Sequence, residues 1–239
     1  MGNHLETDKF QELDDLKNTF VALASHELRT PMNLIQGYLE MGLDVLDDEP
    51  ERARDYLDLA LKNSKRMMRI VQELTDFARL TRGREINHSD PVSIGQAFQE
   101  TWKLLKPDLD QKAVDLVVQI GPEVSEKEFD ADNLIVIFRN ILSNAAKFSP
   151  ENSSVLIKGE QKNSELVIGF HDQADPIPES KQETIFQDFR QLENYLTRRY
   201  EGMGLGLAVA RRTARLLGGD IKLKVRKNGN SFFVMLPNH

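Results

Sequence analysis

The sequence predicts a chain of two parts, a helical hairpin followed by an α/β sandwich. Apolar residues recur at spacings of three and four over residues 5–80, and Pro50 interrupts that pattern once. Beyond Gly83, short β-like runs alternate with helical stretches. An alternation of this kind is typical of a sheet with helices on one face. We therefore expect two domains, one at 5–82 and one at 84–239.

Each of the two predicted hairpin helices carries two adjacent apolar stripes. Those of the first helix are Leu13, Leu16, Phe20 and Leu23, flanked by Val21, Leu28 and Ile35; those of the second are Leu57, Leu61, Met68 and Val71, flanked by Met67, Ile70, Leu74 and Phe77. The polar segment 47–50 is the expected loop between them. One hairpin cannot bury two stripes per helix, so we expect a homodimer through residues 5–82 that forms a four-helix bundle. The alternative is one hairpin that packs on the downstream domain.

Strand-like and helix-like segments follow one another in the second part. The expected strands cover 114–120, 155–159, 166–170, 221–225 and 232–236, and the expected helices cover 93–106, 131–147, 179–187 and 204–217. Asp130 and Asp132 are candidate N-caps of the second of these helices, because a carboxylate accepts the free N–H groups of a first turn. Ile137, Ile141 and Phe148 share a helix face that we expect to be buried.

Composition and charge exclude several classes of function. The 239 residues include 31 Lys and Arg against 38 Asp and Glu, and this net charge of −7 speaks against nucleic-acid binding as the main task. The absence of cysteine removes disulfides, zinc–thiolate sites and cysteine nucleophiles. The longest apolar run has five residues, whereas a membrane span needs about 20. We expect a cytoplasmic chain, with any membrane anchor of a full-length protein in a segment outside this sequence.

A nucleophile, an acid and a hydroxyl share the segment His26-Glu27-Leu28-Arg29-Thr30-Pro31. His26 lies at the edge of an apolar stripe, so we expect its ring to reach solvent. A neutral imidazole is a good nucleophile near pH 7, and the adjacent Glu27 can orient it or take its proton. Thr30 lies one turn further along the same face. A His–Glu pair by itself is more often an ordinary surface pair, so the whole six-residue motif is needed.

Asn140, Asn144 and Lys147 lie on one face of the 131–147 helix. Two amides and an ammonium group suit a magnesium–polyphosphate, with amide oxygen toward the cation and ammonium toward phosphate oxygens. A solvated polar face fits the same spacing equally well.

Three alternating glycines, Gly202, Gly204 and Gly206, open the last predicted helix. Glycine lets the backbone approach a ligand closely, and the N–H groups at a helix start offer an anion site. No Gly-Lys-Ser/Thr follows, so the segment is not a Walker A loop. Just upstream, Arg198 and Arg199 are either partners for a phosphate or a solvated charge pair.

Together these segments resemble the H-box, N-box, lid and G2 box of the sensor histidine kinases of two-component systems, members of the GHKL superfamily. The segment 185–189 is similar to the F-box of the same family. The resemblance implies a HisKA dimerisation and phospho-acceptor domain, then a Bergerat-type HATPase domain that uses ATP and Mg²⁺. It implies that His26 accepts the γ-phosphoryl group, that Glu27 is the assisting base, and that Thr30 serves dephosphorylation of the response regulator.

The same resemblance implies roles for the residues of the nucleotide site. Asn144 would coordinate Mg²⁺, Asn140 and Lys147 would line the phosphates, and one of the two lid arginines would meet the γ-phosphate. The three glycines of the G2 box would approach the nucleotide. The phosphoryl group would then pass to an aspartate on the receiver domain of a separate response regulator.

The expected adenine-binding segment departs from the family pattern Asp-x-Gly-x-Gly and is a degenerate G1 box. Asp172, which would bind the adenine amino group, is present, but Ala174 and Pro176 replace the glycines. Alanine is tolerated unless the backbone needs a positive φ, whereas proline fixes φ and removes an N–H. Because the other motif residues are retained, we expect ATP to bind. The alternative is a pseudokinase or phosphotransfer scaffold with weak or no ATP binding.

Two further classes of protein compete with the kinase interpretation. An ATPase of the gyrase or mismatch-repair kind would need a water-activating acid on the N-box helix and would not need an H-box. A structural coiled-coil dimer would explain residues 5–80 and nothing beyond them.

Overall fold

A computed structural model describes residues 2–81, 90–188 and 203–238 of the chain, with the side chains of residues 20–80 and of the two later ranges. The chain forms two compact units, Met1–Thr75 and Asp76–His239, and each is considered by itself. Among the helices of the described ranges, none combines the length and the apolar character that a bilayer crossing requires.

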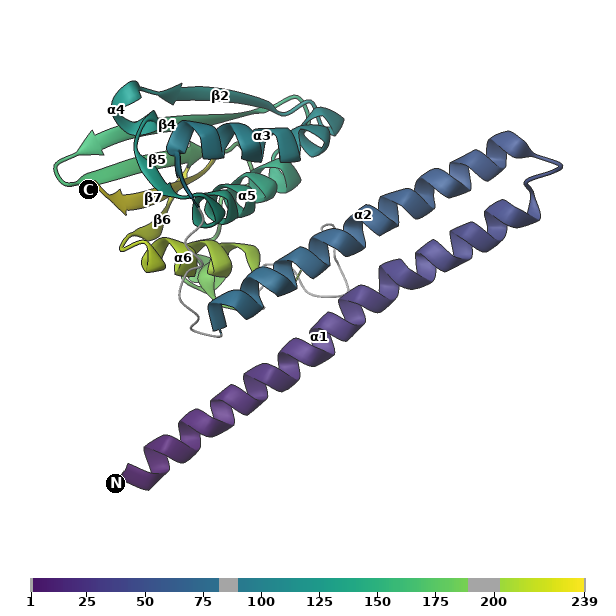
Figure 1. The fold of residues 1–239 in the computed structure, drawn as a ribbon, viewed down its shortest axis with the longest axis horizontal. Coiled ribbons are helices and arrows are strands. Elements are labelled where there is room, and N and C mark those ends of the chain that lie inside the picture. The colour runs from purple at the N-terminus through teal and green to yellow at the C-terminus, as the bar shows by residue number, and fades with distance from the viewer. Residues whose placement is uncertain (1, 82–89, 189–202, 239) are drawn as a thin grey trace. The chain divides into compact units, whose positions relative to one another are not determined.

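The first unit is a hairpin of two long helices (Figure 1). Helix α1 covers Gly2–Asp44, and helix α2 begins at Pro50 and ends at Thr81, with its residues from Asp76 onward in the second unit. The turn between them includes the predicted polar loop, and the backbone N–H of Glu49 donates to the carbonyl of Val45 at 2.8 Å. Pro50 occupies the first helical position, where its missing N–H leaves no intrahelical bond unmade.

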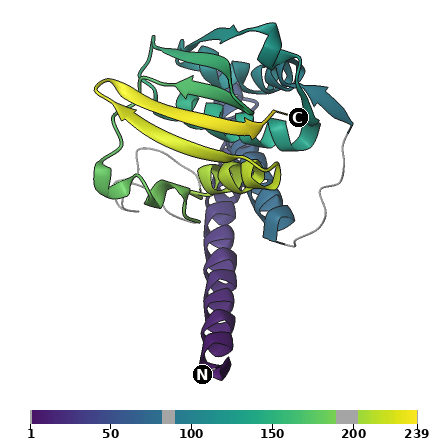
Figure 2. The ribbon, with the colours of Figure 1, turned by 90° about the vertical axis from the view of Figure 1, so that its left-hand side faces the viewer.

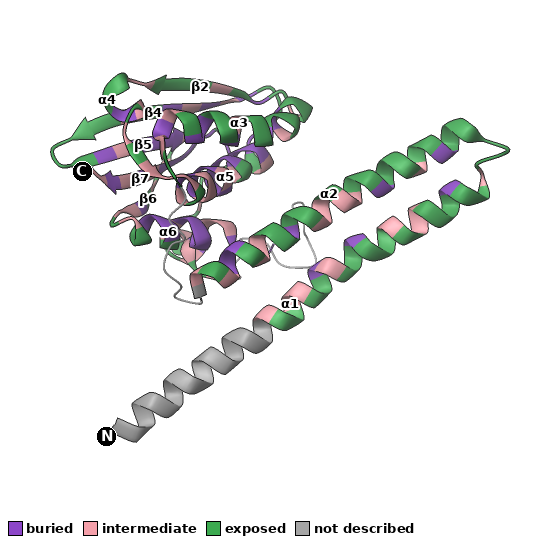
Figure 3. Ribbon diagram, viewed as in Figure 1, coloured by how far each residue is buried: buried purple, intermediate pink, exposed green. Residues whose placement is uncertain are grey.

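Burial separates the apolar residues of α2 into two groups. Ala53, Ala60 and Ile70 are buried in the single chain. The stripe of Leu57, Leu61, Met68 and Val71 instead stays 47–70% exposed. Figure 3 shows both buried and exposed positions along α2. The hairpin therefore buries one of the two apolar groups of this helix and leaves the other to solvent.

The second unit is built on a five-stranded sheet in the order β2-β4-β5-β7-β6 (Figure 2). The strands are β2 (Asp115–Ile120), β4 (Ser154–Lys162), β5 (Glu165–His171), β6 (Asp220–Arg226) and β7 (Gly229–Pro237). β2 runs parallel to β4, and the other neighbours are antiparallel. A separate two-stranded sheet pairs β1 (Pro91–Ser93) with β3 (Glu128–Asp130).

Helices α3 (Ile94–Gln111), α5 (Ala131–Phe148) and α6 (Gly206–Leu216) lie on one face of the large sheet, and the short α4 covers Pro122–Ser125 (Figures 1 and 2). Their apolar sides and the inward side chains of the strands form one core. Asp130 caps α5 as expected, because its carboxylate accepts the backbone N–H of Asn133 at 2.9 Å. The predicted α/β sandwich is confirmed.

Two local predictions in this unit are wrong. The expected helix at 179–187 is instead a pair of short 3₁₀ turns, Glu179–Lys181 and Thr184–Phe186. Pro178 stands directly before the first turn, and no apolar repeat of three and four runs through the segment to hold a longer helix. Phe148, expected in the core, is 41% exposed, because it ends α5 and its ring lies beneath the Lys147 ammonium at 4.8 Å.

Candidate active site

His26 lies on the exposed side of α1, as the sequence predicts. The hydroxyl of Thr30, one turn further, donates to the carbonyl oxygen of His26 at 3.3 Å, and Thr30 is also exposed. The helix continues through Pro31, which has no N–H to donate to the Glu27 carbonyl four residues earlier. An accessible imidazole and an accessible hydroxyl therefore share one turn of the first unit.

Glu27 is buried, whereas its neighbour His26 in the motif is exposed. Consecutive helical residues point about 100° apart, and the Glu27 side chain is only 2% exposed. Its Oε2 atom lies 4.0 Å from Nη2 of Arg66, which comes from α2 of the same unit. Sequence reasoning missed Arg66, because the spacing of apolar residues does not show which cation of α2 meets which acid of α1.

The three polar residues of α5 differ in their surroundings. Asn140 is buried, and its Nδ2 donates to the carbonyl of Val136 at 2.8 Å. Asn144 and Lys147, one and two turns further, are half-buried. The three side chains thus share a helix face, as expected. Asn140 is covered, whereas Asn144 and Lys147 are accessible.

The start of α6 packs directly against the first of these amides. A Cβ placed on Gly206 would lie 2.9 Å from Oδ1 of Asn140, so glycine is what permits this close approach. Gly204 has a φ of +72°, a conformation that favours glycine. Leu205 precedes the helix without a side-chain cap, and the first N–H groups of a helix have no acceptor within the helix itself. Gly202, Arg198 and Arg199 lie outside the described residues.

The polar side chains of α5 suit a cation that is held mainly by the phosphates of a bound substrate. Within the described ranges, no three His, Asp or Glu side chains converge as a metal cage would require. Mg²⁺ is commonly held by one or two protein oxygens together with substrate phosphates. The half-buried amide of Asn144 fits that mode of binding.

Asp172 directly follows β5 and is 4% exposed. Its Oδ1 atom accepts the backbone N–H of Ala174 at 3.1 Å and that of Asn230 at 2.9 Å, together with Nδ2 of Asn230 at 3.3 Å. Burial raises the pKa of the Asp172 carboxyl above its usual value, and these hydrogen bonds and the nearby Arg226 act in the opposite direction. The predicted adenine acceptor is therefore a buried carboxylate held at one of its two oxygens.

The replaced glycines do not leave a strained backbone. Among the described residues, the three non-glycine residues with a positive φ all lie outside 172–178, so Ala174 occupies a conformation open to any residue. Ala174 is buried, and the segment after Pro176 is tied to β7 by the N–H of Ile177, which donates to Oδ1 of Asn230 at 3.0 Å. Sequence reasoning missed Asn230, because it stands in an apparent hairpin turn far along the chain.

Two family models match the chain in sequence. The His Kinase A (phospho-acceptor) domain matches residues 16–83, and the histidine kinase-, DNA gyrase B- and HSP90-like ATPase family matches residues 129–239. A phospho-acceptor domain ahead of the ATPase domain argues against both the gyrase-type ATPase and the coiled-coil alternative.

Curated relatives are named as histidine kinases. The chain is 30% identical to the hybrid signal transduction histidine kinase D of Dictyostelium discoideum over 96% of this chain and 15% of that protein. It is 30% identical to BarA of Escherichia coli over 96% of this chain and 25% of that protein. The chain thus spans about a quarter or less of the length of these relatives.

Solved structures share the fold. The Acinetobacter baumannii histidine kinase AdeS aligns with a TM-score of 0.66 at 18% identity, over 90% of this chain and 98% of that one. The histidine kinase ThkA, solved in complex with the response regulator protein TrrA, aligns with a TM-score of 0.71 at 22% identity, over 99% of this chain and 66% of that one. Both support a helical hairpin followed by an α/β sandwich.

Proposed function

The chain belongs to the sensor histidine kinases, and on that premise we propose that it transfers the γ-phosphoryl group of ATP to His26. The observation that supports this most is the exposed imidazole of His26 in a chain whose second unit also carries the buried Asp172 carboxylate and the glycine-lined start of α6. The imidazole is a nucleophile. The Asp172 carboxylate suits the adenine end of a nucleotide, and the start of α6 suits its phosphate end.

We propose that ATP binds between α5 and the start of α6. Asp172 would accept a hydrogen bond from the adenine amino group, while Asn140, Lys147 and the first N–H groups of α6 would face the phosphates. One of the lid arginines, Arg198 or Arg199, is proposed to meet the γ-phosphate. Support by analogy comes from the neighbour ShkA, which was solved with AMPPNP.

Asn144 is the residue proposed to hold Mg²⁺, which neutralises phosphate charge when it is bound. Positioning and charge neutralisation supply most of the catalysis in phosphoryl transfer. The protein's contribution is then to present the nucleotide to the imidazole and to exclude water.

In the proposed reaction a ring nitrogen of His26 attacks the γ-phosphorus, the bond from that phosphorus to the bridging oxygen breaks, and ADP leaves. The phosphorylated ring then loses the proton from its other nitrogen, and Glu27 is proposed to take it. The Glu27 carboxylate is buried near Arg66.

We propose two protein partners. The exposed apolar stripe of α2 fits a homodimer through residues 5–82. The phosphoryl group would pass from His26 to an aspartate of a response-regulator receiver domain, and the complex of ThkA with TrrA supports that by analogy. Thr30 is proposed to assist dephosphorylation of the same regulator. Because ATP and such regulators are cytoplasmic, we place these two domains in the cytoplasm.

The experiment is incubation of the chain with γ-labelled ATP and Mg²⁺, beside His26→Ala. We expect a label that is labile to acid and stable to alkali, confined to the wild type, with ATP binding equal in both. A label that persists in His26→Ala would overturn the choice of acceptor. No label, with ATP still bound, would indicate a dependence on a sensor segment.

A pseudokinase or scaffold without nucleotide binding is not favoured. That interpretation rested on Ala174 and Pro176, and the loop that holds them takes no conformation that requires glycine. Calorimetry with ATP distinguishes the two, because the scaffold predicts no heat of binding.

A further inference from the structure

We propose that Asn230 is a positioning residue for adenine recognition, because its side-chain amide braces the 172–177 loop in the absence of the G1 glycines. This inference rests on the proposed function, in which Asp172 meets the adenine amino group. Asn230 lies on β7, 58 residues from Asp172, and is 2% exposed.

The side chain of Asn230 makes three hydrogen bonds to this loop. An amide side chain offers two N–H donors and one carbonyl acceptor. Nδ2 of Asn230 donates to Oδ1 of Asp172 at 3.3 Å and to the carbonyl of Asp175 at 3.1 Å, and its Oδ1 accepts the N–H of Ile177 at 3.0 Å. Three bonds from one buried side chain thus fix both the carboxylate and the backbone beyond it.

The two backbone bonds flank the proline. Pro176 has no N–H, so the loop loses a donor where the family pattern has a glycine. The amide of Asn230 engages the carbonyl of Asp175 immediately before it and the N–H of Ile177 immediately after it. Because Pro176 has no backbone N–H to donate, the loop is instead held by hydrogen bonds from Asn230 on β7.

The same contacts orient the carboxylate. In the described part of the chain, the hydrogen bonds that Asp172 accepts on its carboxylate all end on Oδ1. Oδ2 is then the atom left to accept a ligand N–H, and its direction is set by the bonds to Oδ1. An acceptor aimed in this way favours a base with an exocyclic amino group over one that presents a carbonyl there, that is, adenine over guanine.

The backbone next to Asn230 also lies close to the backbone of Asp172. Gly229 has a φ of +127°, and a Cβ on it would lie 2.1 Å from the carbonyl oxygen of Asp172. That oxygen also accepts Nη2 of Arg226 at 2.6 Å. Further, the backbone N–H of Asp172 donates to the carbonyl of Asn230 at 3.0 Å. The strand that carries Asn230 is therefore locked to the loop it braces.

The test is the binding of ATP and of GTP to the full chain, by calorimetry, for the wild type and three variants. We expect Asn230→Ala to weaken ATP binding by tenfold or more, on the order of one lost hydrogen bond to a charged group, with much less effect on GTP. The ratio of the two affinities decides the matter, because a purely structural defect would lower both affinities together. Asn228→Ala, an exposed asparagine in the same hairpin turn, is the matched control and should change neither.

Asn230→Ser covers the case in which Asn230→Ala fails to fold. Its hydroxyl is too short to reach both Asp175 and Ile177, so the ATP-to-GTP ratio should again fall, while the smaller cavity favours folding. If a folded Asn230 variant keeps the wild-type ratio, the brace is refuted. If the wild type itself binds no ATP, the proposed function fails instead.

Discussion

At the scale of single residues, His26 and Glu27 occupy different surroundings on adjacent positions of one helix. The imidazole is exposed, and the carboxylate is buried beside Arg66. In the proposed reaction a proton therefore passes from an exposed ring to a buried carboxylate.

Glu27→Gln tests whether that acid takes the proton. The amide keeps the size of the side chain and removes its basicity, so the rate of His26 phosphorylation at saturating ATP should fall by about 10²-fold or more. The rate is measured as initial incorporation of labelled phosphate, with ATP affinity as the control for folding. A rate within about twofold of the wild type would assign Glu27 a structural role only.

The environment of Asp172 predicts how ATP binding depends on pH. Burial raises the pKa of this carboxyl above the ordinary 3.8, and the adenine amino group needs the ionised form as acceptor. As pH falls, ATP affinity should therefore decline at pH values higher than an ordinary aspartate would give. Asp172→Asn should bind ATP more weakly and lose this decline. Calorimetric titrations over a pH series compare the two proteins, and an equal acid decline in both would contradict the assignment.

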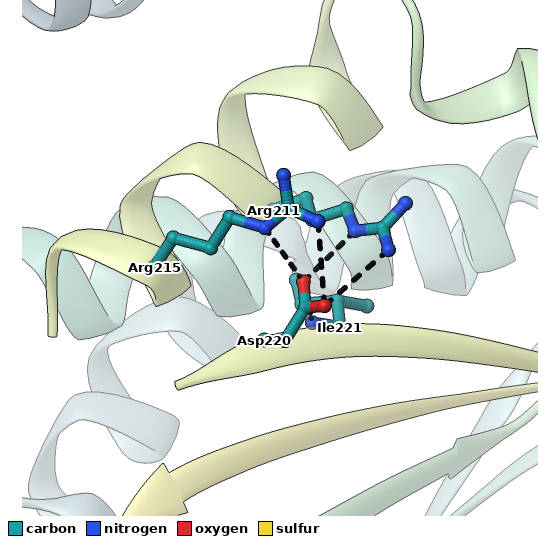
Figure 4. A network of polar contacts seen from close by, with 4 residues as sticks. All are labelled: Arg211, Arg215, Asp220 and Ile221. Carbon is teal, nitrogen blue, oxygen red and sulfur yellow. Dashed lines mark hydrogen bonds and ion pairs between the residues drawn. The ribbon is translucent and has the colours of Figure 1, made fainter. Parts of the chain in front are cut away.

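At the scale of elements, α6 is attached to β6 by one acid and two arginines (Figure 4). Asp220 accepts Nε of Arg211 at 2.8 Å and Nε of Arg215 at 3.1 Å, besides the N–H of Ile221. Burial alone would raise the pKa of Asp220, but these hydrogen bonds outweigh it and hold the pKa well below its usual range. The network fixes the helix whose first turn is proposed to face the phosphates.

Asp220→Asn should lower the free energy of unfolding by about 1–2 kcal/mol at neutral pH. Because the folded-state pKa is depressed, this stabilisation is present above the unfolded pKa and is lost as pH falls through the folded one. Urea unfolding at several pH values measures it. Asp110→Asn is the control, since Asp110 pairs with Lys106 where both are more than half exposed, and it should change stability by less than about 0.5 kcal/mol. Equal effects of the two variants would contradict the role of the network.

Sequence patterns predicted the elements that have a strong period and missed those that depend on distant partners. Helix α5 was predictable because its apolar residues repeat and Asp130 caps it. The strands β1 and β3 have three residues each, too few to show an alternation, and they exist only by pairing with each other. The bonds of Asn230 join positions more than 50 residues apart, and no local pattern carries that information.

At the scale of the whole molecule, the apolar surface of the first unit remains to be explained. Leu57, Leu61, Met68 and Val71 follow one another at spacings of three, four and seven along α2 and stay exposed in the single chain. Helices in a bundle bury apolar stripes of this period against one another, and such a buried stripe is called a seam. A second copy of the same hairpin offers the same seam, and a two-fold axis would place the two seams face to face.

The double variant Leu61→Asp/Met68→Asp tests that arrangement. Two carboxylates in the middle of an apolar seam would have to be desolvated without partners, so the chain should change from dimer to monomer. Sedimentation equilibrium gives the mass of each species. Lys62→Asp adds comparable negative charge beside the seam and should leave the dimer intact. A dimer that survives the double change would mean that the hairpins meet through another face, and the exposed stripe of α2 would then need a different partner.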